Sequence, residues 1–334
     1  MTSVIGVDAG NSKTDVALVL LDGTVGALVR GGGSSPHGHG LAASIEIIRE
    51  LCGQALAEAG EERQPDAAAL FVAGVDQEDE RLDFAKALEA RPLAERIEVA
   101  NDTFAVLRAG ASDGVGVGVV CGAGMNAVAV SPDGETVRFG ALGALTGDWG
   151  GGADLGTGAL GAAVRCEDGR GPETSLVRAV PAHFGLESAL AVAIAVHRER
   201  IARERLVELA PLVLSAAREG DVAAISLIER QAGEIDSLAA TASRRAFGDQ
   251  AHRIVLGGGL LSPRSELTDR VAKALSKSVP SARVLACDVP PIAGAAAAAL
   301  ELAGAAPQAA LIARERLREL DAGRRVMAST GGER

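Results

Sequence analysis

One pattern of apolar and polar positions occurs twice along the chain: an apolar strand, a glycine-rich turn, a second apolar strand and a hairpin turn. An apolar strand at Val4–Asp8 leads into a Gly-rich polar turn, a second apolar strand and a hairpin turn at Asp22–Gly23. The same series starts at Val119–Asn126 and ends at Asp133–Gly134. Asp-Gly between alternating apolar segments is a strong hairpin signal. The repetition predicts two related halves whose glycine turns face a common cleft, which is suited to holding phosphates.

The rest of the pattern predicts an α/β protein of two domains. After three strands in the first half, apolar residues recur at every third or fourth position from Leu41 to Ala55, which is typical of a helix. A strand, a helix, a strand and a helix complete this half. The second half repeats the three strands, continues into a mostly helical insertion at about 153–247, and resumes the alternation from residue 253. We place the N-terminal domain at 1–110 and the C-terminal domain at 111–290.

The end of the chain is expected to carry little structure of its own. Acidic and basic residues alternate over Arg314–Arg325, which predicts a solvated terminal helix. The segment 326–334 is small and polar, and we expect it to be a disordered tail.

Composition and charge narrow the class of protein. The 334 residues are enough for two domains with cores of their own; 48% of them are hydrophobic, but only 2% are aromatic. No apolar run approaches the roughly 18 residues that span a bilayer, and the first residues lack signal-peptide features. The net charge of −11 argues against a nucleic-acid or anionic-membrane partner. Because the four cysteines share no short metal-binding spacing, we expect a reduced, cytoplasmic protein.

The turn after the first strand carries the first candidate chemistry. Its glycine lets the backbone approach a ligand closely, and its hydroxyls and ammonium group are donors for phosphate oxygens. The candidate phosphate-binding residues are Gly10, Asn11, Ser12, Lys13 and Thr14. Asp8 ends the strand, where its carboxylate would hold a metal ion through water. A plain hairpin explains the same residues, whereas a Walker loop does not, because its Gly-Lys-Ser/Thr ending and following helix are missing.

Two further glycine-rich segments occur in the order that a nucleotide fold needs. Gly122–Asn126 is the partner of the first turn, and its asparagine is able to contact phosphate or metal-bound water. Gly257–Gly259 follows a strand, so an adenosine moiety would lie against bare backbone, unless the glycines serve close helix–strand packing. The candidates here are Gly122, Ala123, Gly124, Asn126, Gly257, Gly258 and Gly259. Gly114–Gly118 is not a dinucleotide-binding fingerprint, since its glycines lie within an alternating strand.

Asn101 and Asp102 lie between the last strand and the last helix of the first half. Helix capping explains an aspartate at such a position. The end of the strand is also where α/β sheets bind ligands, and a carboxylate there is able to take the proton from a hydroxyl that attacks a γ-phosphate. We therefore predict that Asp102 is a general base, with Asn101 beside it in the substrate site.

Two loops carry further candidates for substrate binding. In the tight loop Gly147–Gly150, Asp148 is able to hydrogen-bond paired hydroxyls and Trp149 is able to stack on a ring face. A turn with a packed indole is the alternative. His37 lies in the loop Gly31–Gly40, where a solvated loop residue is as good an explanation as substrate contact.

As an ordered series, these motifs resemble those of the BadF/BadG/BcrA/BcrD ATPase family, and within it most closely the N-acetylglucosamine kinases of the actin, sugar kinase and Hsp70 superfamily. The resemblance covers roughly residues 3–303 and is carried by Asp8–Thr14, Ala73–Asp76, Asn101–Asp102, Gly122–Asn126, Gly147–Gly150 and Leu256–Gly259. It implies two ribonuclease-H-like (actin-like ATPase) domains with ATP and Mg²⁺ in the cleft between them. It also implies a final helix, at about 291–304, that returns to the first domain.

The resemblance implies roles for particular residues: Asp102 is the base acting on the 6-hydroxyl of a sugar, both glycine turns bind phosphate, and Asp148 binds sugar hydroxyls. The chain departs from the family pattern at Trp149, where Glu is usual, and at Ser34–Ser35, where Ser-Asn is usual. Both departures lie on the sugar side and bear on which sugar is bound. The candidate substrate contacts are Ser35, His37, Asn101, Asp102, Gly147, Asp148 and Trp149.

The sequence thus predicts an ATP-dependent kinase for an amino sugar, with N-acetylglucosamine as the first candidate, working as a homodimer. Two other classes remain open. The activases of 2-hydroxyacyl-CoA dehydratases share the fold but bind a cluster through cysteines, and Cys121 and Cys166 fit no such motif. A sugar-sensing regulator would need a DNA-binding helix-turn-helix, for which the sequence leaves no room before Val4 or in the C-terminal tail.

Overall fold

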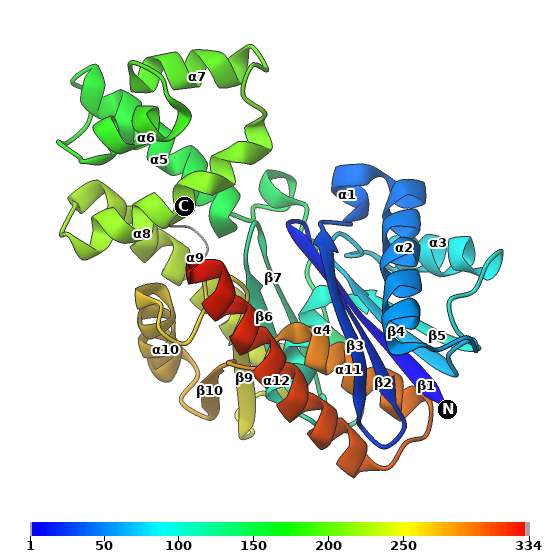
Figure 1. Ribbon diagram of the computed structural model, residues 1–334. Helices are drawn as coiled ribbons and strands as arrows, with labels where there is room; N and C mark the ends of the chain where they lie inside the picture. The colour runs from blue at the N-terminus through cyan, green and yellow to red at the C-terminus, as the bar shows by residue number, and fades with distance from the viewer. Residues whose placement is uncertain (1, 331–334) are drawn as a thin grey trace.

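The computed structural model describes residues 2–330 of the chain, the last six of them by their backbone alone. Two halves lie side by side, and a lobe of helices extends from the second half (Figure 1). Each half is built around a five-stranded sheet.

The first sheet has the strand order β3-β2-β1-β4-β5. Its strands are β1 (Ser3–Ala9), β2 (Lys13–Leu20), β3 (Val25–Gly32), β4 (Ala67–Val72) and β5 (Arg96–Asn101). The first three strands pair antiparallel, whereas β1, β4 and β5 are parallel. β1 and β4 are buried along their whole length, which fits their nearly continuous apolar sequence. At the predicted hairpin turn, Gly23 has a φ of 92° and Asp22 accepts a hydrogen bond from the Thr24 N–H.

The second sheet, of order β10-β9-β6-β7-β8, repeats this scheme. Its strands are β6 (Gly116–Cys121), β7 (Met125–Val130), β8 (Thr136–Val137), β9 (His252–Gly257) and β10 (Ala282–Ala286). Again the first three strands pair antiparallel, and β6, β9 and β10 are parallel. The internal repeat predicted from the sequence is confirmed.

Helices cover one face of each sheet in matching positions. On the first sheet these are α2 (Leu41–Ala59) and α3 (Glu78–Glu89), with the single turn α1 (Pro36–His39) before them. On the second sheet they are α9 (Val222–Phe247) and α10 (Glu266–Ser278). The predicted insertion therefore ends in a helix, α9, that belongs to the repeated unit. The lobe is formed by α5 (Gly151–Glu167), α6 (Leu176–Phe184), α7 (Ala189–His197) and α8 (Ala210–Arg218), with the short 3₁₀ helices η1 (Gly143–Leu145) and η2 (Arg203–Leu209).

Two helices lie between the sheets, and each packs on the sheet of the other half. They are α4 (Asp102–Gly110) and α11 (Pro291–Leu302). α11 contacts β1 and β4, whereas α4 contacts β6 and β9. Glycines permit the close approach: a Cβ on Gly6 would lie 2.6 Å from the backbone nitrogen of Ala296, and one on Gly118 would lie 2.9 Å from the Leu107 Cβ. α11 is thus a final helix that returns to the first half, as the resemblance implied.

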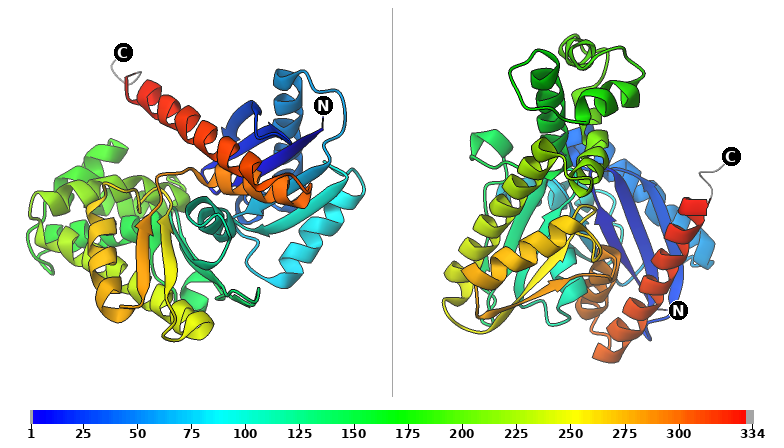
Figure 2. Two further views of the ribbon diagram at one scale, coloured as in Figure 1. Left: turned by 90° about the horizontal axis from the view of Figure 1, so that it is seen from below. Right: turned by 90° about the vertical axis from the view of Figure 1, so that its left-hand side faces the viewer.

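The last helix, α12 (Pro307–Thr330), lies against the first half next to α11 (Figure 2). Ala309, Ala313 and Leu317 are buried on the α11 face of the first sheet. The predicted terminal helix is confirmed, but it is not simply solvated, because one face of α12 is apolar and packs on the first half. The helix includes residues 326–330, which we expected in a disordered tail, because the helix that begins at Pro307 continues through them. Residues 331–334 of that predicted tail lie outside the described residues.

Within residues 2–330, no single helix has both the length and the apolar composition to cross a membrane; α6 and α7 meet that test only as a pair bent by 49°.

Candidate active site

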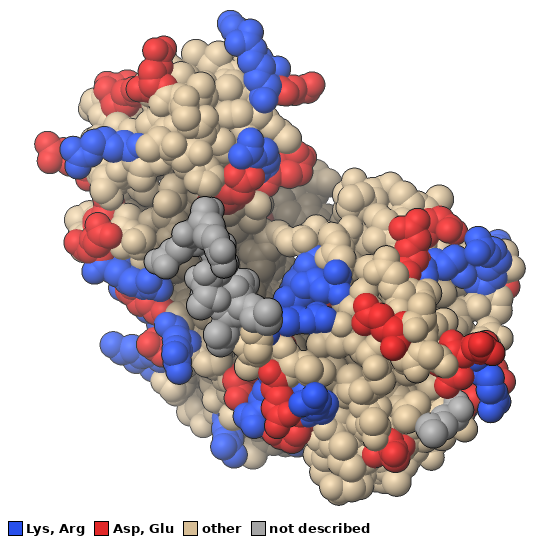
Figure 3. All heavy atoms as spheres, in the orientation of Figure 1, with Lys and Arg blue, Asp and Glu red and all other residues tan. Residues whose placement is uncertain are grey.

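Three carboxylates lie at or just after the carboxyl ends of three neighbouring parallel strands of the first sheet. Asp8 lies at the end of β1, Asp76 follows β4 and Asp102 follows β5. Because the carboxyl ends of parallel strands share one edge of a sheet, these side chains gather at that edge. The space-filling view shows the surface hollowed between the helical lobe and the first half (Figure 3).

Burial raises the pKa of all three carboxyls, and repulsion by the other two raises the pKa of Asp102 further. Burial, followed by the charges of Asp8 and Asp76, raises the pKa of Asp102 to about 7. Burial also raises the pKa of Asp8 to about 7, against the opposing charge of Lys13, and it raises the pKa of Asp76. A carboxyl with a pKa near the working pH is suited to general acid–base chemistry. Asp102 therefore has the electrostatic setting that a general base needs.

Helix α4 begins at Asp102, but the neighbouring residue caps it. Asn101 Oδ1 accepts hydrogen bonds from the Thr103 N–H at 3.0 Å and from the Thr103 hydroxyl at 2.5 Å. The capping explanation that the sequence left open for Asp102 thus applies to Asn101.

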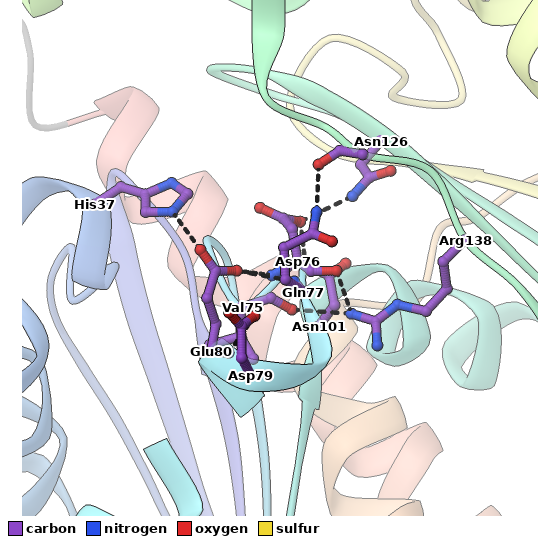
Figure 4. A network of polar contacts seen from close by, with 10 residues as sticks. His37, Val75, Asp76, Gln77, Asp79, Glu80, Asn101, Asn126 and Arg138 are labelled. Carbon is purple, nitrogen blue, oxygen red and sulfur yellow. Dashed lines mark hydrogen bonds and ion pairs between the residues drawn. The ribbon is translucent and has the colours of Figure 1, made fainter. Parts of the chain in front are cut away.

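A polar network joins the two halves beside this capped helix (Figure 4). Asp76 Oδ1 accepts a hydrogen bond from Asn101 Nδ2 at 2.8 Å and another from Asn126 Nδ2 at 2.9 Å. One carboxylate oxygen therefore binds an amide from each half. Asn126, which we predict as a contact for phosphate or metal-bound water, reaches across to the first half through this bond.

The loop after β4 makes three more hydrogen bonds to the second half. Arg138 Nη2 donates to the carbonyl oxygens of Val75 and Asp76, at 3.2 and 2.7 Å. Gln77 Nε2 donates to the Gly140 carbonyl at 2.7 Å. This loop is the main polar connection between the halves near Asp102.

A hydrogen bond within the backbone closes the first glycine turn, and some of its predicted donors are exposed whereas one is buried. The Gly10 N–H donates to the Lys13 carbonyl at 2.9 Å. Asn11, Ser12 and Lys13 are exposed, but Thr14 is buried and its hydroxyl lies 2.6 Å from the Ser34 hydroxyl. The turn therefore leaves Asn11, Ser12 and Lys13 open to a ligand and engages Thr14 elsewhere.

The second and third glycine segments lie against each other at the end of β6. A Cβ on Gly258, whose φ is 97°, would collide with the Cys121 carbonyl, and one on Gly257 would meet the Val106 side chain. Gly259 is exposed and would have no atom within 4 Å of its Cβ. Close packing thus explains two of these glycines, whereas Gly259 is open to a ligand.

The N–H groups of Gly152 and Ala153, in the first turn of α5, donate to the carbonyls of Gly122 and Ala123. The second glycine turn is therefore fastened to the start of the helical lobe.

Ser35 and His37 lie close to the loop that carries Asp76. A Cβ on Gly74 would lie 2.8 Å from Ser35 Oγ and 3.0 Å from the His37 ring. Ser35 Oγ is buried without a hydrogen-bond partner, and His37 Nε2 lies 3.4 Å from Glu80 Oε1. His37, Asp76 and Glu80 each offer a ligand atom within 4.8 Å of the others, an arrangement that suits sugar hydroxyls or a cation. The structure brings these predicted residues together with Asn101.

Gly147, Asp148 and Trp149 form a separate group in the second half, between η1 and α5. Asp148 lines a cavity of about 180 Å³ beside Ala123, Gly124 and Met125 of the second glycine turn. Trp149 packs against the core of the second half, and the guanidinium carbon of Arg230 lies 4.0 Å from its ring centroid. This arrangement favours the packed indole over a ring that stacks on a ligand.

Asp8 fits a magnesium ligand. The residue is only 9% exposed, and among the residues that the structure describes none donates a hydrogen bond to its carboxyl. A carboxylate without a protein donor, at the edge of the sheet that carries the phosphate-binding candidates, suits a hard cation that prefers oxygen ligands.

Several residues of the site were missed as functional candidates. Asp76 was noted only as part of a motif, although it follows a buried strand as Asp8 and Asp102 do, and that signal was sufficient to find it. Glu80 and Arg138 had no such signal, because their roles depend on contacts with distant segments.

Two sugar kinases match most of the chain. It is 26% identical over 288 residues to the N-acetylmuramic acid/N-acetylglucosamine kinase of Clostridium acetobutylicum, a match that covers 85% of this chain and 94% of the relative. It is 27% identical over 311 residues to the N-acetyl-D-glucosamine kinase of Dictyostelium discoideum, which covers 89% and 97%.

Solved structures show the same fold. A Chromobacterium violaceum protein, provisionally named an N-acetylglucosamine kinase, matches with a TM-score of 0.71 and 27% identity over 91% of this chain and 99% of that one. A glucokinase of the ROK family from Streptomyces griseus, bound to glucose and AMPPNP, matches with a TM-score of 0.55 and 18% identity over 89% and 98%. The predicted fold, two actin-like ATPase domains, is confirmed.

The model of the BadF/BadG/BcrA/BcrD ATPase family matches residues 5–301. The sheet scheme occurs in both halves, and the three carboxylates lie at one edge of the first sheet. Together with these features, the match confirms the resemblance seen in the motifs, and the chain belongs to the BadF/BadG/BcrA/BcrD ATPase family.

Proposed function

We propose that this protein is an ATP-dependent kinase that phosphorylates the 6-hydroxyl of an amino sugar, with N-acetylglucosamine as the first candidate. The observation that carries the proposal is Asp102: a half-buried carboxyl with a pKa raised to about 7, at the first position of a helix that another residue caps. The names of the two sugar kinase relatives, each matched over most of its length, support the choice of an amino sugar.

In this mechanism Asp102 accepts the proton of the sugar hydroxyl as that oxygen attacks the γ-phosphorus of ATP. A raised pKa makes its carboxylate a better base, while a useful fraction remains ionised at neutral pH. Asp76 holds Asn101, and Asn101 caps the helix that starts at Asp102, so the base is fixed in position.

The phosphates are bound by the two glycine turns. The exposed Ser12 and Lys13 supply donors and positive charge from the first half, and Gly122–Gly124 supplies backbone from the second. Mg²⁺ held near Asp8 would neutralise charge on the phosphates. Closure of the halves on each other would exclude water, which limits wasteful hydrolysis of ATP.

The activase alternative finds no support in the cysteines. Cys121 is fully buried beneath the second glycine turn, and burial raises the pKa of its thiol to about 12. A thiol that resists deprotonation in the core is a poor cluster ligand.

We also propose a cytoplasmic homodimer. Leu190 and Ile194, one turn apart on α7 of the lobe, are 52% and 41% exposed and would be covered in an interface. Size-exclusion chromatography with light scattering tests this point, and a monomer at micromolar concentration would contradict it.

The kinase proposal is tested by the release of ADP from ATP and Mg²⁺ with N-acetylglucosamine, glucosamine, N-acetylmannosamine, N-acetylmuramic acid, glucose or no sugar. We expect turnover that depends on an N-acetylated sugar, and a roughly 10²–10⁴-fold lower turnover for Asp102→Asn with ATP binding nearly intact. Asp83→Asn, the same change at an exposed site on α3, is the matched control. Equal turnover of Asp102→Asn and wild type would remove Asp102 from the mechanism, and ADP release without any sugar would favour an ATPase.

A further inference from the structure

Helix α12 follows β3 along the first sheet as far as the edge that carries the glycine turn. At its start, Gly23 of the β2–β3 hairpin lies so close to the Ala309 carbonyl that a Cβ there would collide with it. Ala313 and Leu317 continue the contact as buried residues. Four residues after Leu317, Asp321 reaches Arg30, near the opposite end of β3. The helix therefore connects the hairpin tip with the edge of the sheet where nucleotide phosphates are proposed to bind.

At that edge, α12 takes part in a chain of charged groups. Asp321 Oδ1 accepts a hydrogen bond from Arg30 Nη2 at 3.0 Å. The same guanidinium binds Asp15 with two bonds, from Nε to Oδ1 at 2.6 Å and from Nη2 to Oδ2 at 2.9 Å. Arg324, also on α12, places Nη1 3.9 Å from Asp15 Oδ1 and donates from Nη2 to the Leu28 carbonyl.

The chain ends on the lysine of the first glycine turn. Lys13 Nζ lies 2.8 Å from Asp15 Oδ2, on the same face of β2, because the two residues are separated by one position. Asp15 pairs in register with Asp8 on β1 and with Arg30 on β3. The charges thus form a row across three strands, from the magnesium candidate to α12.

Burial determines which charges of this row must be balanced within the protein and which remain available to a ligand. The Asp15 side chain is 1% exposed, so its carboxylate needs cationic partners to remain ionised. Burial raises its pKa, but the hydrogen bonds and charges of Arg30 and Lys13 outweigh that effect and hold the pKa below its usual range. Arg30 occupies both oxygens and balances the carboxylate. Lys13, 45% exposed, is held by one oxygen only, and its positive charge remains available to a phosphate.

From this geometry we propose that Asp321, Arg30 and Asp15 are positioning residues, through which α12 orients Lys13 for the phosphates of the nucleotide. The inference rests on the proposed function, since it assigns to Lys13 the role of phosphate ligand. It adds a part to the nucleotide site that the family match, which ends at residue 301, does not contain.

Without Arg30, Asp15 would have Lys13 as its main partner and would draw the ammonium fully onto itself. Without Asp321, Arg30 would keep its bonds to Asp15 but lose the acceptor on α12 that holds its Nη2. We therefore expect a large effect of the arginine and a smaller effect of the aspartate on nucleotide binding, with little effect on the sugar.

The test compares Arg30→Ala, Arg30→Lys and Asp321→Asn with wild type. A matched control is Arg318→Ala, which removes exposed ion pairs of α12 to Asp288 and Glu315, at 3.4 and 2.8 Å, and leaves the bonds among Asp321, Arg30 and Asp15 in place. Calorimetry measures the binding of ATP with Mg²⁺ in the absence of sugar, and kinase assays measure KM for ATP and for the sugar. Circular dichroism checks that every variant is folded.

We expect Arg30→Ala to weaken ATP binding about tenfold, as the loss of one charge-assisted hydrogen bond would. Arg30→Lys should recover part of that loss, because it restores the charge but not the two-bond geometry. Asp321→Asn should weaken binding about threefold, and the KM for the sugar should stay within about twofold for all variants.

Folded Arg30→Ala and Asp321→Asn variants that bind ATP as tightly as wild type would overturn the inference. Equal losses of affinity for ATP and sugar would also overturn it, because they would indicate a general structural role. Wild-type protein that does not bind ATP would instead refute the proposed function.

Discussion

Replacing Asp102 by asparagine is expected to stabilise the folded protein, although we also expect it to lower the kinase activity. The change keeps the shape of the side chain and removes a charge that the fold disfavours. The pKa of this carboxyl is raised from 3.8 to about 7, a difference of about 3 units. Each unit corresponds to about 1.4 kcal/mol, so ionised Asp102 costs the folded state at most about 4 kcal/mol.

The sign of the effect sets its pH dependence. Because the folded state prefers the neutral carboxyl, Asp102 costs nothing below about pH 4, where it is neutral in both states. As the pH rises from about 4 to about 7, the unfolded chain gains an ionised group that the folded protein resists, and stability is lost. The Asp102 side chain is partly exposed, and nearby dipoles and water screen its charge. We therefore expect a destabilisation above pH 7 of about 2 kcal/mol, half of the upper limit.

The assay is thermal unfolding of the protein without ligands at pH 5 and pH 8. At pH 8 the melting temperature of Asp102→Asn should exceed that of wild type by about 4 °C, and at pH 5 by less than half of that. The exposed Asp83→Asn variant should change little at either pH. A less stable Asp102→Asn variant at pH 8, or an equal gain at both pH values, would refute the electrostatic argument.

Three further changes test other parts of the site. Asn126→Ala removes the second-half bond to Asp76 and should raise the ADP released per sugar phosphate formed, because closure loosens; an unchanged ratio would show that closure does not depend on this bond. Arg230→Ala should shift Trp149 fluorescence and leave the KM for sugar within about twofold, whereas a KM raised many-fold would place the indole at the sugar. Gly258→Ala should lower stability to urea by about 1–3 kcal/mol, and a neutral effect would contradict the strain expected from its φ of 97° and its collision with the Cys121 carbonyl.

The sequence predicted the parts of this protein that depend on near neighbours. Apolar alternation located the strands, and the two Asp-Gly turns marked the hairpins, because each depends on a few adjacent residues. The repeat of that series was enough to predict two related halves. Asp8 and Asp102 were proposed as site residues for the same reason, since each is a polar residue at the end of an apolar strand.

The partners of those residues were decided by the tertiary structure alone. The bond between Asp76 and Asn126 joins residues 50 positions apart, and the bond between Arg30 and Asp321 spans 291 positions. No local period records such a pairing, because it forms only when separate segments are packed against each other. For this reason the sequence by itself predicted a kinase-like fold, a candidate base and two candidate phosphate loops, whereas only the packed molecule showed which groups contact these candidates.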